Sequence, residues 1–419
     1  MNLKRKGFFR SLFVFIAVLG PGIVTSNVDN DAGGITTYSI AGAQFGYSLL
    51  WVFIPITIAL IVVQEMCARM GAVTGKGLAD LIRERYGVRV ILFVMIGLIF
   101  TNLGNTVAEF AGIAASTELF GLSKYISIPI GALLVWGIVL KGSYKTVERI
   151  FLFASVLFLS YVISGALAKP DWGAVLEGAV KPTFSLQSGY LSMIIGLVGT
   201  TIAPWMQFYI QSTVVEKGIT VQRYAYTRLD VVAGSFMAVL VAIFIVVACS
   251  ATLFTHGIQV ETAKDAAQAL APLAGNWASV LFALGLLNAS LFAASILPLS
   301  TSYYVCEAFG FEAGIDKSWS EAPVFYSLYT IFIVIGASII LIPKISLILV
   351  MLWSQIINGI LLPFILIFML QLVNNTDLMG KYVNSPVYNV VAWTTTAVMI
   401  GLTALLVTTS IFGVRLDLL

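Results

Sequence analysis

Polar residues and glycines interrupt the first hydrophobic stretch of the chain, residues 11–51. They are Asn27, Asp29, Asn30, Asp31, Gly33 and Gly34. A carboxylate at membrane depth costs about 2.5–3.5 kcal/mol on insertion scales, so its usual reason is function. Paired glycines allow a helix to unwind and expose carbonyl groups, which a membrane tolerates only where backbone lines a cavity. We expect a ligand site here; a loop between two short helices, or a polar contact between helices, is the alternative.

A second break lies in the sixth hydrophobic stretch, residues 188–215. Gly196 and Gly199 precede Pro204 there. Because proline removes a backbone donor and clashes with the preceding turn, the helix is expected to open. A lone kinking proline is usually structural. Two interrupted helices at matching positions of two halves, however, are typical of inverted-repeat transporters, whose substrate binds near the bilayer midplane where the breaks meet.

The two breaks offer oxygen ligands. Asp29 and Asp31 provide carboxylates. Neutral oxygens come from side chains or carbonyl groups at Asn27, Val28, Asn30, Thr200, Ile202 and Gln207. Hard oxygens favour Mg²⁺, Ca²⁺ or Mn²⁺ over zinc or copper. An amino-acid substrate would instead need neutral side chains and helix N-termini around its own carboxylate. The residues alone therefore predict a cation transporter.

The composition indicates an all-α integral membrane protein. Hydrophobic residues make up 59% of the 419 residues and charged residues 10%, whereas soluble proteins carry about 25% charged residues. A single histidine, His256, and three scattered cysteines give no imidazole-based metal site and no disulfide framework. No nucleophile–base pair supports an enzyme, and a net charge of +3 indicates no nucleic-acid partner. We expect no cofactor and no obligatory protein partner.

Hydrophobic stretches predict eleven transmembrane helices, of which the first and sixth are broken. They lie near residues 9–47, 48–70, 88–118, 126–141, 147–168, 188–215, 230–254, 273–308, 324–342, 345–373 and 386–413. With the N-terminus in the cytoplasm and the C-terminus outside, 17 of the 23 Lys and Arg residues fall on the inner side, as the positive-inside rule requires. We expect one transporter domain over residues 1–419, with repeats at about 9–168 and 188–373 and an extra helix at about 386–413.

Several sequence runs are specific in combination. They are Gly20-Pro21-Gly22, AGAQFGY at 41–47, ARMGAVTGKGLADLIRERYG at 68–87, Ala108-Glu109, DAAQALAPLAGNWASVLFALGLL at 265–287, Ser354-Gln355 and Pro363-Phe364. Through these runs, nearly the whole chain resembles the NRAMP family of divalent-metal transporters. The resemblance implies a LeuT-like 5+5 inverted repeat followed by an eleventh helix, in agreement with the hydrophobic pattern.

Departures from the family pattern concern the ion ligands. Aligned back from residues 41–47, the family's Asp-Pro-Gly-Asn is Asp-Ala-Gly-Gly at residues 31–34, so the aspartate is kept and the asparagine ligand is a glycine. The family's Met-Pro-His is Ala-Pro-Trp at residues 203–205, which lacks the thioether and the imidazole. A thioether helps a site to prefer manganese and iron over magnesium and calcium. Mg²⁺ retains its waters and suits a roomy, oxygen-lined site.

A further departure concerns proton coupling. The family's proton-path aspartate falls on Thr106, although Glu109 is kept, and the ninth span has none of the family's arginines. These changes remove groups that could relay a proton. The pattern resembles the prokaryotic NRAMP-related magnesium transporter branch, whose members are taken to be uncoupled from protons.

The resulting prediction is uptake of Mg²⁺, with Mn²⁺ also accepted, by alternating access across the plasma (inner) membrane of a prokaryote. The chief alternative is a proton-coupled Mn²⁺/Fe²⁺ importer of the conventional NRAMP type. A sodium-coupled amino-acid transporter on the same fold is a second alternative. A membrane enzyme or a channel is a third, although two unwound helices suit a carrier better than an open pore.

The metal ligands that we expect come from both breaks and from the tenth span. They are Asp31, Val28, Gly34, Ala203, Gln207, Gln355 and Asp29. Asp31 is the main candidate, with a helix-end hydrogen bond as its alternative role. The resemblance implies that Gln355 approaches the ion in occluded states. If the register of the second break slips, the sulfur of Met206 could replace the missing thioether.

Overall fold

The computed structural model describes residues 28–141 and 155–412, which form helices and connecting turns with no strand among them. Its longer helices are α3 (Ala32–Phe45), α4 (Phe53–Thr74), α6 (Val88–Glu118), α7 (Lys124–Lys141), α9 (Leu159–Leu167), α11 (Ser188–Thr201), α12 (Pro204–Glu216), α13 (Tyr224–Thr252), α16 (Ala278–Phe309), α17 (Pro323–Ile340), α18 (Leu347–Val373) and α20 (Pro386–Phe412). Shorter elements include α5 (Leu78–Tyr86), α10 (Trp172–Val180), α14 (Ala263–Ala267), α15 (Ala271–Ala274), α19 (Thr376–Met379) and the 3₁₀ turns η1 (Gly46–Val52) and η2 (Ser155–Phe158).

The all-helical membrane fold predicted from hydrophobicity is confirmed. In the described part of the chain, eight helical stretches are long and apolar enough to cross a membrane. Three differences explain why eight such stretches are found where eleven transmembrane helices were predicted. The first two predicted spans join through η1 into one stretch, Ala32–Thr74; the apolar helix Lys124–Leu140 is shorter; and the fifth predicted span is described only from Ser155. Both predicted breaks are present, while the limits of the repeats and of the single domain stay predictions.

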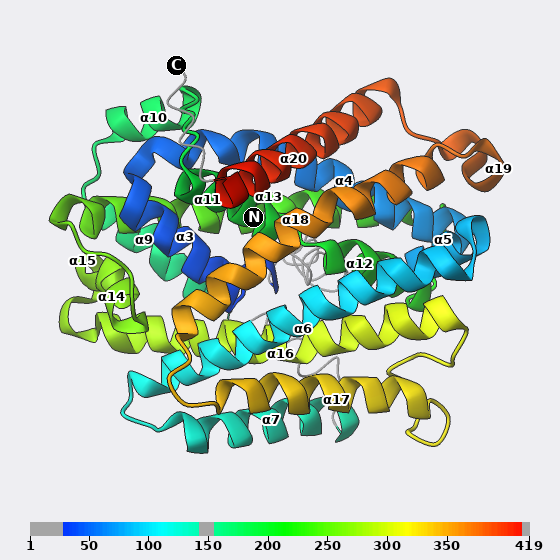
Figure 1. Ribbon diagram of the computed structural model, residues 1–419, viewed down its shortest axis with the longest axis horizontal. Helices are drawn as coiled ribbons and strands as arrows, with labels where there is room; N and C mark the ends of the chain where they lie inside the picture. Colours follow the sequence, from blue (N-terminus) through cyan, green and yellow to red (C-terminus); the bar gives the residue numbers. More distant parts are fainter. Residues whose placement is uncertain (1–27, 142–154, 413–419) are drawn as a thin grey trace, which may run out of the picture.

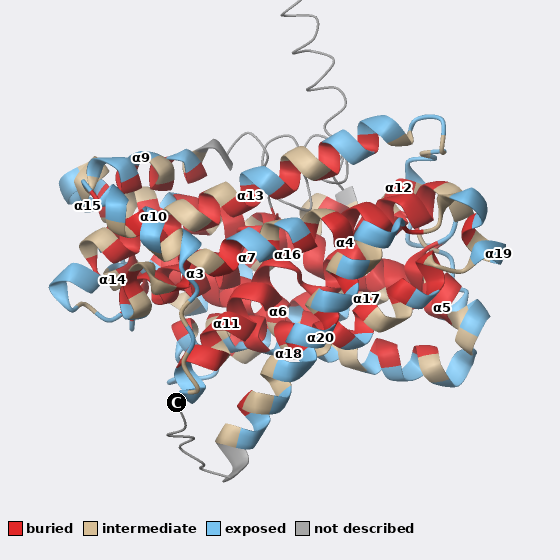
Figure 2. Cartoon of the chain, turned by 90° about the horizontal axis from the view of Figure 1, so that it is seen from above, coloured by how far each residue is buried: buried red, intermediate tan, exposed pale blue. Residues whose placement is uncertain are grey.

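The helices surround the two broken ones. Figure 1 shows α6 running beside both α16 and α18, with α17 and α7 along one edge. Figure 2 shows α11 and α12 in the buried interior, whereas α20 carries exposed residues along much of its length. The exposed side chains of α20 include Val387, Trp393 and Val398. An apolar helix of this kind is what a lipid-facing span requires.

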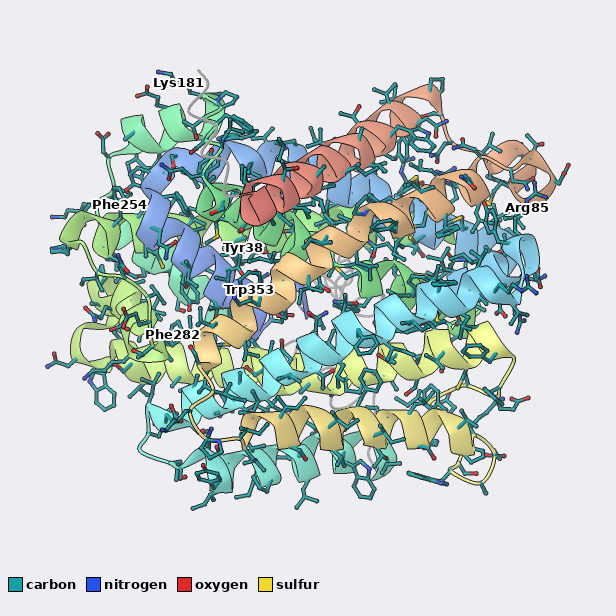
Figure 3. All side chains as sticks on the ribbon, viewed as in Figure 1. Tyr38, Arg85, Lys181, Phe254, Phe282 and Trp353 are labelled. Carbon is teal, nitrogen blue, oxygen red and sulfur yellow. The ribbon has the colours of Figure 1, made fainter. Side chains whose placement is uncertain are left out.

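Two charged residues, Arg85 and Lys181, indicate how the helices lie relative to a membrane. Figure 3 shows Arg85 and Lys181 at opposite ends of the molecule, and Tyr38 in its middle. The charge bias of the sequence assigns Arg85 to the inner side and Lys181 to the outer side. The two positions are compatible with a membrane between them, and the orientation itself stays a prediction.

Glycines bring α11 and α18 into backbone contact. A Cβ added at Gly199 would lie 2.1 Å from the carbonyl oxygen of Gln355 and 2.3 Å from the backbone nitrogen of Gly359. A Cβ added at Gly359 would lie 2.3 Å from the carbonyl oxygen of Ile195. Small residues permit such close approach between membrane helices. The first half of the second broken helix is therefore packed directly against the helix that carries Gln355.

We predict that Gly359→Ala destabilises the protein by about 1–3 kcal/mol, the usual cost of overpacking, because α11 and α18 must separate. Thermal unfolding in detergent, followed by fluorescence-detected size-exclusion chromatography, measures the loss. Gly285→Ala is the matched control, since a Cβ at this buried position in α16 would meet no atom within 4 Å. Equal stability of the two variants would contradict the proposed backbone contact.

Candidate functional site

The first break lies where α3 begins. Asp31 is the N-cap residue, with extended backbone (φ −71°, ψ −176°), and its Oδ1 accepts a hydrogen bond from the N–H of Gly34 at 2.6 Å. The N–H of Ala32 donates to Oε2 of Glu109 on α6 at 3.2 Å. Two carboxylates therefore satisfy free N–H groups at the positive end of α3. Asp31 makes the helix-end hydrogen bond that was its alternative role through Oδ1, and its role as a metal ligand stays a prediction.

Oxygens from both breaks converge around Gly34. A Cβ at this position would lie 2.7 Å from the carbonyl oxygen of Asp29, 3.1 Å from Oγ1 of Thr200 and 3.4 Å from Oδ1 of Asp31. We call these three oxygens the oxygen cluster. The absence of a side chain at Gly34 allows the three oxygens to approach it closely. Thr200 brings the second break into the cluster, since it lies one residue before the end of α11.

Buried oxygens in the same region lack partners among the described residues. These atoms are both carboxylate oxygens of Asp29, Oδ1 of Asn30, Oγ1 of Thr200 and Oε1 of Glu109. Buried polar atoms are nearly always hydrogen-bonded, and an uncompensated buried carboxylate is costly. The carboxyl groups of Glu109 and Asp31 both accept hydrogen bonds from the first turn of α3, so they are neighbours. A divalent cation would offset this concentration of oxygen and negative charge.

The second break separates α11 from α12. Between them, Ile202 and Ala203 leave helical geometry, and Pro204 begins α12, where its missing N–H costs nothing. The amide of Gln207, one turn into α12, lies 2.5 Å from the carbonyl oxygen of Ala203 and 2.7 Å from that of Pro204. Both carbonyls can only accept hydrogen bonds, so the amide satisfies them only when it is oriented with Nε2 towards them. In this conformation Gln207 thus binds the backbone of the break, and its role as a metal ligand stays a prediction.

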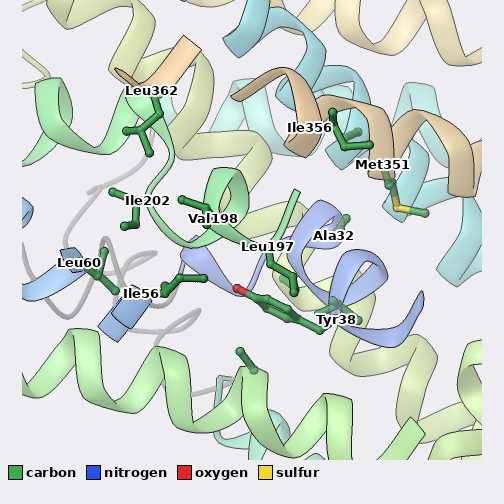
Figure 4. Packing of buried hydrophobic residues seen from close by; sticks show 14 of the residues in the cluster. Ala32, Tyr38, Ile56, Leu60, Leu197, Val198, Ile202, Met351, Ile356 and Leu362 are labelled. Atoms are coloured by element: carbon green, nitrogen blue, oxygen red, sulfur yellow. The ribbon is translucent and has the colours of Figure 1, made fainter. Parts of the chain in front are cut away.

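A hydrogen bond joins the two broken helices. The hydroxyl groups of Tyr38 on α3 and Thr201 on α11 are 3.0 Å apart. Figure 4 shows Tyr38 beside Leu197 of α11, within the buried apolar core. The sequence interpretation gave neither side chain a role, although both are polar groups in otherwise apolar spans.

An apolar cluster adjoins the second break. It contains Val28, Ala203, Trp205, Met206, Tyr209, Phe292, Ala293, Ile296 and Leu297. The side chains of Val28 and Ala203 pack within it, so these two residues could contribute to an ion site only through their carbonyl groups. The side chain of Met206 is buried in the same cluster, and its role as a replacement for the missing thioether stays an alternative.

Gln355 of α18 contacts the first break. A Cβ at Gly33 would lie 1.9 Å from its Nε2 atom. The structure thus brings Asp31, Gly34, Asp29 and Gln355 together at the start of α3. Asn27 lies outside the described residues.

Two broken helices that meet at buried oxygens, within a helical membrane protein, define a carrier of the LeuT-like fold. Comparison with known proteins agrees with this class. A mutant of the manganese transporter of Eremococcus coleocola superposes with a TM-score of 0.76 at 21% identity, covering 96% of this chain and 88% of that one. The closed form of Mhp1, a nucleobase-cation-symport-1 family transporter, gives a TM-score of 0.57 at 15% identity, covering 93% of each chain.

Residues 22–409 match the family described as natural resistance-associated macrophage protein-like, and the chain belongs to this Nramp family. A divalent metal cation transporter, MntH of Deinococcus radiodurans, is 29% identical over 398 residues, which are 92% of this chain and 88% of the relative. Members of this family are multi-pass membrane metal transporters rather than enzymes. The family resemblance stated from the sequence is confirmed, and its magnesium branch is not tested by these comparisons.

We predict that Asp31→Asn abolishes metal uptake and leaves the protein folded. The asparagine keeps an oxygen that can cap α3, but it removes the negative charge that a cation needs. Mn²⁺ uptake into proteoliposomes is expected to fall to the level of empty vesicles, with unchanged elution on size-exclusion chromatography. Asp171→Asn is the matched control, because Asp171 caps α10 in the same way, 2.9 Å from the N–H of Gly173. Normal uptake by Asp31→Asn would mean that Asp31 caps α3 but does not bind the metal ion.

Proposed function

We propose that this chain carries divalent metal ions across the plasma membrane of a prokaryote by alternating access, with Mg²⁺ as its principal substrate and Mn²⁺ also accepted. Membership of the Nramp family and the names of its relatives, a divalent metal cation transporter and a manganese transporter, support metal transport. The main support for the choice of ion is the oxygen cluster. The three atoms nearest to a Cβ placed at Gly34 are all oxygens.

The chemistry of the donors favours a hard ion. Carboxylate, hydroxyl and carbonyl oxygens suit Mg²⁺, whereas a thioether would favour softer metals. Alanine stands at position 203, where the family pattern has methionine. Gly34 has no side chain and so allows these oxygens to approach its Cα closely. Mg²⁺ usually keeps several waters, so the ion is proposed to bind partly hydrated.

The surroundings of Thr106 support transport without protons. Its Oγ1 donates to the carbonyl oxygen of Asn102 at 2.8 Å. A Cβ added at Gly336 of α17 would lie 2.8 Å from its methyl group, so α17 packs tightly on this position. Neither Thr106 nor the sequence of α17 offers an ionisable carboxyl, imidazole or guanidinium group. A proton would therefore need a route other than the one between α6 and α17.

A proton-coupled Mn²⁺/Fe²⁺ importer of the conventional type is the second candidate. One observation favours it, because Glu109 lies next to Asp31 and could exchange a proton with it. The names of the relatives also mention manganese. The two candidate functions differ in whether Mg²⁺ competes with Mn²⁺ for uptake. They also differ in whether the side chain at position 203 determines the preference between the two ions.

We predict that excess Mg²⁺ suppresses Mn²⁺ uptake by the wild-type protein in proteoliposomes. Ala203→Met restores a thioether and is expected to raise the Mg²⁺ concentration needed for half-suppression by about tenfold, which corresponds to about 1.4 kcal/mol in relative binding. Ala203→Leu, a side chain of similar size without sulfur, is the matched control. An equal shift in both variants would mean that cavity size decides. If excess Mg²⁺ leaves Mn²⁺ uptake by the wild-type protein unchanged, the proposal that Mg²⁺ is a substrate is contradicted.

A further inference from the structure

A chain of buried amide side chains runs from the first break across α18 and α6. It consists of Gln355, Asn358, Asn105 and Asn102, which we call the amide ladder; each is at most 1% exposed. Nδ2 of Asn358 donates to Oε1 of Gln355 at 3.0 Å and to Oδ1 of Asn105 at 2.8 Å. Nδ2 of Asn105 donates back to Oδ1 of Asn358 at 3.2 Å and onward to Oδ1 of Asn102 at 3.4 Å. The ladder is thus continuous.

The far end of the ladder is fixed by α16. Nδ2 of Asn102 donates to the carbonyl oxygen of Leu297 at 2.7 Å and to Oγ1 of Thr301 at 2.6 Å. A backbone carbonyl can only accept hydrogen bonds, so the nitrogen of Asn102 must face it. The oxygen of Asn102 then faces Asn105 and requires a nitrogen there. Nδ2 of Asn105 faces Oδ1 of Asn358 as well, so Nδ2 of Asn358 must face the oxygens of Asn105 and Gln355.

The consequence is a defined direction for the amide of Gln355. Its oxygen is held by Asn358, and its nitrogen lies against Gly33 and donates to Oγ of Ser354 at 3.2 Å. An N–H donor that faces the break repels a cation, whereas an oxygen would bind it. The ladder therefore withholds from the break the one atom of Gln355 that could serve as a metal ligand.

We propose that Asn358 is a positioning residue that competes with the metal ion for Oε1 of Gln355. In the conformation described here the ladder holds this oxygen; a bound ion gains it only when the hydrogen bond from Asn358 breaks. The inference rests on the proposed function, because it assumes that the ion binds at the first break. It predicts a change in metal affinity that depends on Gln355, which a purely structural role for Asn358 would not produce.

The test is a double-mutant cycle read by Mn²⁺ affinity, using isothermal titration of the purified protein and the KM of uptake. Asn358→Leu frees Oε1 of Gln355, and the Kd for Mn²⁺ is expected to fall about fivefold, the factor that the net strength of one hydrogen bond implies. Gln355→Leu is expected to raise the Kd. In the Gln355→Leu background, Asn358→Leu should have no further effect on affinity.

The control breaks an equivalent amide pair elsewhere. Asn374, at the end of α18, exchanges hydrogen bonds with Asn389 of α20 at 2.8 and 2.9 Å, and Asn374→Leu is expected to leave the Kd unchanged. Asn358→Ala serves as a second variant if Asn358→Leu folds poorly. An unchanged or higher Kd in the Asn358 variants, or the same change with and without Gln355, would overturn the proposal. Because both candidate functions include Mn²⁺, failure of the proposed Mg²⁺ selectivity leaves this test intact.

Discussion

A membrane interior offers no water to a broken helix, so every backbone group freed at a break needs a partner from the protein or from the cargo. At the start of α3 these partners are side chains of the protein: Asp31 accepts from the N–H of Gly34 and Glu109 accepts from the N–H of Ala32. Side-chain oxygens of Asp29, Asn30, Thr200 and Glu109 lack hydrogen-bond partners among the described residues. The surroundings of the first break therefore contain a surplus of acceptors that a cation would satisfy.

The sequence alone predicts the helical class, the two breaks and the separation of apolar from polar residues along the chain. These features depend on composition and on local rules for glycine and proline, which operate within a few residues. The first two predicted spans are correct as apolar segments but join through η1 into one helical stretch. A hydrophobicity profile reports how apolar each segment is but not the backbone geometry between two segments. It could therefore not show that η1 joins the two spans into one helical stretch.

The contacts that shape the candidate site could not be predicted from the sequence. Ala32 bonds to Glu109 across 77 positions, and Asn105 pairs with Asn358 across 253. Hydropathy gives the depth of such residues in a membrane but not the direction in which a side chain points around its helix. Thr200 was one of several neutral oxygens in the pattern, and only the packing of α11 against α3 brings it to Gly34. The asparagines of α6 and α18 were visible as polar residues in apolar spans and were not recognised as a connected group.

Neutral amide side chains adjoin the carboxyl groups of the first break. The amide ladder connects α18, α6 and α16 by directed hydrogen bonds, and Thr106 on α6 bonds to the backbone of its own helix. Amides can exchange partners without gaining or losing a proton at neutral pH. A site built from them can respond to an ion through rotation of a side chain and movement of α18. The proposed choice of ion and the proposed transport without protons therefore both depend on residues of α3, α6 and α18.

Uptake of Mg²⁺ into proteoliposomes, followed by a lumenal magnesium dye and a pH dye at the same time, tests the central claim most directly. The account predicts that lumenal Mg²⁺ rises in vesicles containing the protein without acidification of the lumen, and that Mn²⁺ is also transported. Transport of Mn²⁺ alone, accompanied by acidification, would contradict it, and the conventional proton-coupled function would then apply to this chain.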